Sequence, residues 1–133
     1  MAYAQRILVV DDQDSMRQLL CSALRALGYT EVITAANGSE ALKILRGRMI
    51  DAVLLDVEMP VMGGHECLRA IRDDPKLVDT PVVMVTARAD EKFVGAIRPL
   101  EPRGYLVKPV TAATLKSCLD RIWANPETAR PAV

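Results

Sequence analysis

The chain has 133 residues, of which 50% are hydrophobic and 26% are charged, and its 17 Lys and Arg balance its 17 Asp and Glu. This length and composition predict a single soluble domain with a proper hydrophobic core. The zero net charge argues against a general nucleic-acid binder, which needs a basic surface, and no apolar run approaches the roughly 18 residues of a membrane span.

Five segments are predicted as β-strands. Most are continuous apolar runs, which indicates strands that are buried on both faces, as in a parallel sheet. They span about residues 6–10, 32–33, 52–56, 81–86 and 104–107. The pair 32–33 has the weakest signal, and we expect it to form an edge strand. Because the first strand lies so close to the start of the chain, we expect no signal peptide and a cytoplasmic protein without membrane insertion.

The first amphipathic segment is predicted as a helix that Asp14 caps and that ends at Gly28. Its apolar stripe has the spacing of one helix face and consists of Met16, Leu19, Leu20, Ala23, Leu24 and Leu27. Further helices are predicted over about 39–46, after Gly64 as far as Asp73, over 91–98, and after the cap residue Thr111. Pro99 and Pro102 should prevent the fourth helix from continuing.

Strands and helices alternate five times, which predicts a parallel sheet with helices on both faces and right-handed crossovers. Five strands are too few for a (β/α)₈ barrel, so the predicted fold is a doubly wound α/β three-layer sandwich. We expect residues 1–124 to form the domain. Residues 125–133 contain two prolines and no periodicity, and they are predicted to be a flexible C-terminal tail.

Other residues have structural interpretations. Cys21, Cys67 and Cys118 have apolar neighbours in predicted helices, and we expect three reduced, mostly buried thiols rather than a metal or redox site. His65, the single histidine, is expected at the surface, and Trp123 is expected to cover the core.

Polar side chains stand where four predicted strands end. Asp11 and Asp12 follow the first strand, Asp56 ends the third, Thr86 ends the fourth and Lys108 follows the fifth. Open α/β sheets bind ligands at the carboxyl ends of their strands. Three carboxylates at one edge would repel one another, and Mg²⁺, a hard cation that prefers oxygen ligands, would relieve the repulsion. The plain alternatives are a helix cap or solvated loop for the acids and a surface lysine for Lys108.

Asp56 is a candidate nucleophile, because carboxylates form acyl phosphates with phosphoryl donors. Such a transfer requires neutralisation of the charge on the phosphoryl oxygens. Lys108 can supply an ammonium group and Thr86 a hydroxyl donor. The backbone N–H of Ala87 can supply a further donor, and its small side chain leaves access to the site.

These motifs resemble the receiver domains of two-component response regulators, especially the single-domain chemotaxis type. The resemblance covers about residues 6–124 and rests on several motifs in combination: Val9–Asp12 with Ser15–Arg17, Leu55–Pro60, Val83–Ala87, Gly104–Pro109 and Thr111–Leu115. It implies a flavodoxin-like (βα)₅ fold with strand order 2-1-3-4-5.

The resemblance also implies roles for residues at the strand ends. Asp56 resembles the phosphoacceptor. Asp12 and Asp56 resemble direct Mg²⁺ ligands, together with the carbonyl of Glu58, and Asp11 resembles a ligand that acts through water. Mn²⁺ is a possible substitute for Mg²⁺. Lys108 resembles the residue that pairs with the phosphoryl group.

Two further positions resemble a conformational switch. In the family, the hydroxyl at the position of Thr86 moves toward the phosphate, and the aromatic residue at the position of Tyr105 turns inward with it. The face formed by helix 4, strand 5 and helix 5 is then the expected output surface. The implied donor is a phosphohistidine on a histidine kinase or a histidine phosphotransfer protein, or a small acyl phosphate, and the implied output is contact with a downstream protein. The protein would be a signalling switch that catalyses its own phosphorylation and dephosphorylation, not an enzyme acting on a separate substrate.

The chain departs from the family pattern at several positions. Gly63 stands where an aspartate is common, and Val110 where an aromatic residue is common. The stretch Pro99–Arg103 replaces the usual small residues, so the fourth helix should be shorter or kinked. Glu58 and Arg88 occupy positions that tune the rate of phosphate loss, and they could pair across the site. The Lys108–Pro109 bond is often cis in the family.

Two alternatives remain at this point. One is a receiver-like binding module that works without phosphorylation. The presence of all the acids, Thr86 and Lys108 argues against it. The other is a hydrolase of the haloacid-dehalogenase type, which also uses an aspartate at a strand end. That family has a second aspartate two residues after the first, where this chain has Glu58, and it usually carries a cap for which the chain leaves little room.

Overall fold

The computed structural model describes residues 2–87 and 91–124. Within them, five parallel strands form one sheet in the order β2-β1-β3-β4-β5. The strands are β1 (Tyr3–Val10), β2 (Tyr29–Ala35), β3 (Ala52–Asp56), β4 (Val82–Thr86) and β5 (Gly104–Val107). The predicted parallel sheet and its strand order are therefore confirmed. The predicted tail, residues 125–133, lies outside the described residues.

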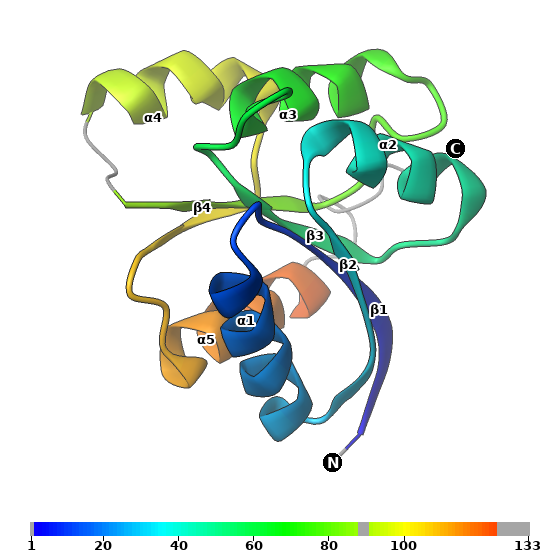
Figure 1. Cartoon of the computed structure of the whole chain (residues 1–133), viewed down its shortest axis with the longest axis vertical. Helices are drawn as coiled ribbons and strands as arrows, with labels where there is room; N and C mark the ends of the chain where they lie inside the picture. The colour runs from blue at the N-terminus through cyan, green and yellow to red at the C-terminus, as the bar shows by residue number, and fades with distance from the viewer. Residues whose placement is uncertain (1, 88–90, 125–133) are drawn as a thin grey trace.

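Helices cover both faces of this sheet (Figure 1). The helical segments are α1 (Asp14–Leu27), α2 (Gly38–Gly47), α3 (Gly64–Asp73), α4 (Glu91–Ile97), a 3₁₀ turn η1 (Arg98–Leu100), and α5 (Ala112–Ala124). Figure 1 shows α1 and α5 on one face of the sheet and α2, α3 and α4 on the other, which confirms the predicted three-layer sandwich. In the described part of the chain, no helix is long and apolar enough to cross a membrane.

The core consists of two apolar layers, one on each side of the sheet. Side chains of β1 alternate between them: Ile7 and Val9 belong to the layer under α1 and α5, while Leu8 and Val10 belong to the layer under α2, α3 and α4. All five residues of β3, and all five of β4, are buried. Continuous apolar runs are the expected sequence of strands that are covered on both faces.

The strand β2 is longer than the predicted pair 32–33. It spans Tyr29–Ala35 at the edge of the sheet and pairs with β1 over most of its length. Its edge position confirms the expectation, but exposed polar residues such as Glu31 interrupt its apolar signal. At its start, the ring of Tyr29 stacks on Tyr3 with centroids 4.4 Å apart. This contact joins residues far apart in the sequence, which explains why local periodicity underestimated the strand.

Two details of the predicted first helix were wrong. Asp14 does not cap α1, because the cap position is Gln13, whose side chain makes no capping bond, and Asp14 is the first helical residue. An acidic side chain there still interacts favourably with the positive end of the helix dipole. Leu19 belongs to the apolar stripe by spacing but is 48% exposed, so the buried stripe is narrower than expected.

The helix α4 is short, as Pro99 led us to expect. It ends at Ile97, one residue before the predicted limit, and continues into η1, where Pro99 occupies the first turn. Proline is tolerated there because the backbone N–H groups of a first turn have no partner within the helix. The segment after η1 then passes through Glu101, which has a positive φ of 51°.

The guanidinium of Arg72 connects this segment to the loop before β4. Its nitrogens donate to four backbone carbonyls: those of Val78 (3.0 Å), Thr80 (2.7 Å), Leu100 (2.7 Å) and Glu101 (3.1 Å). Burial lowers the pKa of Arg72, and the nearby carboxylates of Glu101 and Asp79 oppose this effect. The half-buried Arg72 therefore joins two segments that precede neighbouring strands.

The remaining structural expectations have mixed outcomes. Cys21, Cys67 and Cys118 are free and buried, as expected, and burial raises the pKa of the Cys67 thiol to about 11. Trp123 packs against the core and donates from Nε1 to the Tyr29 hydroxyl at 2.7 Å. His65 lies in the first turn of α3 and is half-buried, so it is less exposed than expected.

Candidate functional site

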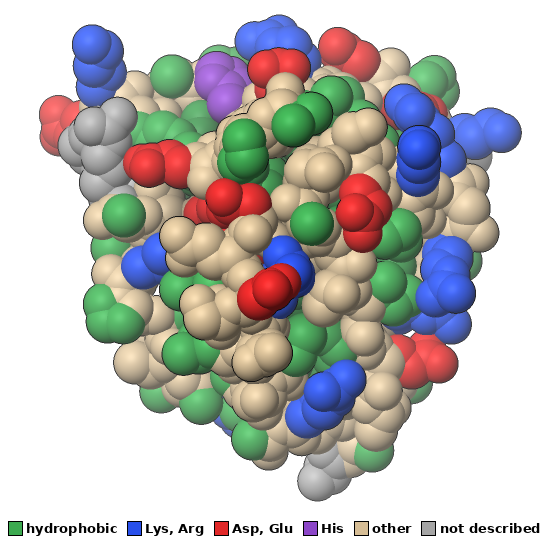
Figure 2. All heavy atoms as spheres, viewed as in Figure 1, with side chains coloured by type: hydrophobic (Ala, Val, Ile, Leu, Met, Phe, Trp, Pro, Cys, Tyr) green, Lys and Arg blue, Asp and Glu red, His purple; other side chains and the backbone are tan. Residues whose placement is uncertain are grey.

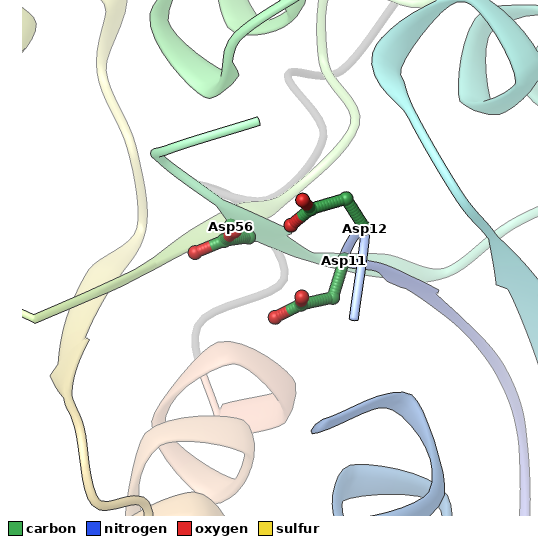
Figure 3. Close-up of side chains that lie close together, drawn as sticks. All are labelled: Asp11, Asp12 and Asp56. Carbon is green, nitrogen blue, oxygen red and sulfur yellow. The ribbon is translucent and has the colours of Figure 1, made fainter. Parts of the chain in front are cut away.

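Three carboxylates converge at the carboxyl edge of the sheet. Asp11 and Asp12 follow β1 directly, and Asp56 is the last residue of the neighbouring strand β3. Each residue offers an oxygen that lies within 4.8 Å of the oxygens of the other two. Figure 3 shows their carboxyl groups directed into the same space. The parallel register thus brings together the acids that the sequence placed at two separate strand ends.

Lys108 completes this cluster from the end of β5. Its Nζ donates to Oδ1 of Asp56 at 3.0 Å and lies 3.6 Å from Oδ2 of Asp11. The backbone N–H of Lys108 donates to the carbonyl of Thr86 at 2.8 Å, which fixes the chain where β5 ends beside β4. The predicted meeting of the acids and the amine at one edge is therefore present in the structure.

The ionisation of the cluster reflects burial and an excess of negative charge. Asp11 is fully buried and Asp56 is 3% exposed. Burial raises the pKa of Asp56, Lys108 opposes the rise, and Asp11 and Asp12 add to it. Burial alone would lower the pKa of Lys108, but the carboxylates of Asp56 and Asp11 outweigh it and raise that pKa. One ammonium thus does not neutralise three carboxylates.

The cluster has the features of a site for a divalent cation. It carries two more negative charges than positive ones if all its groups are ionised. Oδ2 of Asp11 is a buried atom without a hydrogen-bond partner among the described residues. Oxygen ligands, a net negative charge and a buried carboxylate oxygen that lacks a hydrogen bond fit a hard cation such as Mg²⁺. Figure 2 shows several acidic side chains on the face of the molecule that carries this edge.

The other predicted site residues differ in how exposed they are. Thr86 ends β4, next to β3, and is 1% exposed, whereas Ala87 is exposed. The Glu58 side chain is exposed. Tyr105 in β5 is half-buried and meets the ring of Phe93 edge to face, with centroids 6.4 Å apart. The expected pairing of Glu58 with Arg88 cannot be followed, because Arg88 lies outside the described residues.

The loop that follows Asp56 is held close to the strand end. The N–H of Gly64 donates to the carbonyl of Val57 at 2.9 Å, and α3 begins there. A Cβ atom on Gly64 would lie 2.4 Å from the carbonyl oxygen of Asp56, so only glycine fits this approach. From the sequence, Gly64 was expected only to precede the third helix, so this packing role was not predicted. The pair of glycines just after an acidic strand end was the available signal.

Two backbone features flank the cluster. Val61 has a positive φ of 71°, which is unusual for a β-branched residue, and the N–H of Met62 donates to the carbonyl of Pro60 across it. The Lys108–Pro109 bond is cis, as expected. Val61 belongs to the loop between Asp56 and α3.

Asp56→Asn is expected to stabilise the metal-free protein at neutral pH by about 1 kcal/mol. The change removes a buried carboxylate whose charged form the site disfavours, and Lys108 keeps Asp11 as a partner. Denaturation with urea at pH 7, without divalent ions, measures this difference. A variant that is less stable than the wild type under these conditions would contradict the expectation.

The same difference should depend on pH. Folding raises the pKa of Asp56 above its ordinary value of 3.8. At pH values between 3.8 and the raised pKa, the folded chain therefore binds more protons than the unfolded chain. The free energy of unfolding of the wild type therefore falls as pH rises through that window. The advantage of Asp56→Asn should be complete above the window and absent near pH 3, which denaturation at both pH values can check.

The chain is similar in sequence to a known protein family and to several of its members. The family model described as "Response regulator receiver domain" matches residues 7–120. The chemotaxis protein CheY of Pseudomonas aeruginosa is 39% identical over 118 residues, which are 89% of this chain and 95% of that protein. The chemotaxis protein CheY-3 of Vibrio cholerae is 41% identical over 118 residues, 89% of this chain and 91% of that protein.

Solved structures show the same similarity. The chemotaxis protein CheY4 of Vibrio cholerae is similar with a TM-score of 0.84 and 36% identity, covering 90% of this chain and 99% of that one. The response regulator TrrA of Thermotoga maritima, solved in complex with Mg²⁺-BeF, is similar with a TM-score of 0.78 and 36% identity, covering 89% of this chain and 98% of that one.

Proposed function

Because the chain belongs to the family of response regulator receiver domains, we propose that it is a phosphorelay switch in which Asp56 accepts a phosphoryl group. The observation that carries this proposal is the cluster at the sheet edge, where Lys108 Nζ lies 3.0 Å from Asp56 and within 3.6 Å of Asp11. Acids and an amine from three strand ends meet there, which is the arrangement that phosphoryl transfer to a carboxylate requires.

In the proposed reaction, a carboxylate oxygen of Asp56 attacks the phosphorus of a phosphohistidine on a histidine kinase or histidine phosphotransfer protein. The new bond joins this oxygen to phosphorus, and the bond from phosphorus to the imidazole nitrogen breaks, with its electron pair leaving on the nitrogen. With acetyl phosphate as donor, acetate leaves instead. Hydrolysis of the resulting acyl phosphate restores Asp56, so the protein would catalyse both halves of its own cycle.

Charge neutralisation is the main contribution of the surrounding residues. Lys108 already pairs with Asp56, and its ammonium would pair with oxygens of the incoming phosphoryl group. The N–H of Ala87 and the hydroxyl of Thr86 are proposed as further donors. Asp12, Asp56 and the carbonyl of Glu58 would hold Mg²⁺, with Asp11 acting through water. Bound Mg²⁺ would supply Lewis-acid stabilisation of phosphoryl charge, and the Mg²⁺-BeF complex of a relative supports this choice of ion.

The output would be a conformational change that a protein partner reads. We place the switch at Thr86, which is buried beside the cluster, and at Tyr105, which is half-buried against Phe93 of α4. The phosphoryl group would bias two arrangements of these residues, and with them the face formed by α4, β5 and α5. In this chain the helix at that face is short, and it continues directly into the η1 turn.

Intact mass after incubation with acetyl phosphate tests the proposal. The wild type should gain one phosphoryl group only when Mg²⁺ is present, and Asp56→Asn should gain none. A gain that persists in Asp56→Asn would show that another residue accepts the group. If the wild type gains nothing from acetyl phosphate or from a panel of autophosphorylated histidine kinases, the alternative of a binding module that works without phosphorylation would replace this proposal.

A further inference from the structure

The loop between β1 and α1 is held by a side chain that the proposed chemistry does not use. Nη1 of Arg17 donates to the backbone carbonyl of Asp11 at 2.6 Å. The backbone N–H of Arg17 also donates to the carbonyl of Gln13 at 3.0 Å, and the N–H of Gln13 donates to Oδ1 of Asp11 at 2.9 Å. These three bonds close the loop that carries the first two acids of the cluster.

The carbonyl of Asp11 has a direct bearing on Asp12, because it belongs to the peptide group that links the two residues. A peptide group is planar, so a hydrogen bond to its oxygen restrains ψ of Asp11 and φ of Asp12 together. These angles set the direction in which the carboxylate of Asp12 leaves the backbone. The side chain of Arg17 is only 19% exposed, which limits the freedom of the guanidinium to leave this contact.

Asp14 makes the arrangement compatible with a bound cation. A guanidinium beside the acidic cluster would repel a metal ion, but Arg17 also forms an ion pair with Asp14, one turn earlier on α1. The pair is neutral overall. The clamp can therefore hold the loop without adding positive charge near the position that a cation would take.

We infer that Arg17 is a positioning residue, which clamps the carbonyl of Asp11 so that Asp11 and Asp12 hold a divalent cation, and that Asp14 neutralises the clamp. The inference rests on the proposed function, because it concerns the same metal site. Arg17 touches neither the metal ligand atoms nor the phosphoryl group. Because its contribution is geometric, Arg17 should affect the affinity for Mg²⁺ and not the rate of the chemical step.

The double variant Asp14→Ala/Arg17→Ala isolates this geometric contribution, because it removes the clamp and leaves the net charge unchanged. Residues that orient metal ligands typically contribute at least tenfold to metal affinity. We therefore expect the dissociation constant for Mg²⁺, measured by isothermal titration calorimetry, to rise about tenfold. Arg25→Ala, at an exposed arginine in the last turn of the same helix, should leave it unchanged.

Kinetics with acetyl phosphate provide a second readout. The double variant should be phosphorylated slowly at low Mg²⁺ and at nearly the wild-type rate when Mg²⁺ is saturating, because the acceptor Asp56 and Lys108 are intact. A rate that stays low at saturating Mg²⁺ would overturn the inference, since Arg17 would then act on the chemical step or on the fold.

The calorimetric outcomes separate this inference from the function on which it rests. If the wild type and the double variant bind Mg²⁺ equally well, the positioning role of Arg17 is refuted and the proposed metal site is supported. If the wild type does not bind Mg²⁺, the proposed metal site is wrong, and the proposed role of Arg17 is refuted with it. If the alanine variant does not fold, the dissociation constant for Mg²⁺ is measured instead on Asp14→Asn/Arg17→Gln, which also preserves the net charge. The same rise in that constant is expected.

Discussion

Gly64→Ala is expected to lower the free energy of unfolding by about 3 kcal/mol and the rate of phosphorylation of Asp56 by about a hundredfold. The added Cβ would lie 2.4 Å from the carbonyl oxygen of Asp56 and 2.7 Å from Cα of Val57. Both are backbone atoms and cannot turn aside. The start of α3 and the end of β3 must therefore separate, which moves the acceptor carboxylate away from Lys108.

Gly63→Ala is the matched control for this prediction. A Cβ on Gly63 would approach the carbonyl oxygens of Val57 and Met59 at 3.5 and 3.9 Å, which are ordinary contacts, and its φ of −70° suits alanine. We expect a change in stability below about 1 kcal/mol and phosphorylation near the wild-type rate. Urea denaturation and the acetyl phosphate reaction measure both variants, and equal effects of the two substitutions would refute the argument from close approach.

Arg72→Ala is expected to lower the free energy of unfolding by about 3 kcal/mol without removing the phosphorylation of Asp56. The substitution leaves four carbonyl groups without their donor, namely those of Val78, Thr80, Leu100 and Glu101. Water can reach some of them, so the loss is smaller than four separate bonds would suggest. Arg72→Lys should recover only part of the stability, because one ammonium cannot reproduce the planar fork of a guanidinium.

The position of Arg72 separates this stability effect from function. Its partners precede β4 and β5, whereas Asp56 lies at the opposite, carboxyl end of the strands. Where Arg72→Ala is folded, the phosphorylation rate should stay within about twofold of wild type. Arg46→Ala, which removes an exposed ion pair with Asp74, should change the urea midpoint very little. A similar loss from both arginines would mean that the carbonyl contacts of Arg72 contribute nothing specific.

The sheet and the acids at its edge could be predicted from local sequence. Buried parallel strands need apolar side chains on both faces, so runs such as 52–55 identify themselves. The residue that follows such a run lies at the edge of the sheet, and this rule alone brought Asp11, Asp56 and Lys108 together as candidates. The resemblance to receiver domains then supplied the strand order and the separate roles, which residue type and spacing could not.

Other features depended on packing between segments far apart in the chain. The stacking of Tyr3 on Tyr29 extends β2 well beyond its apolar pair. The 2.4 Å approach at Gly64 and the four carbonyl contacts of Arg72 exist only after the layers have assembled. No periodicity marks such residues, because periodicity reports which face of an element is covered and not which atoms cover it.

The loop between β1 and α1 contains features of both kinds, some predicted from the sequence and others visible only in the structure. Sequence alone determined that two acids follow the first strand and that a helix begins soon after them. The tertiary structure decided that Asp14 pairs with Arg17 instead of capping the helix, and that Arg17 holds the carbonyl of Asp11. The physical reason is that the residue at which α1 begins on the sheet fixes these contacts: because the helix starts at Asp14, its carboxylate lies one turn from Arg17 rather than at the cap, and the guanidinium of Arg17 reaches the carbonyl of Asp11.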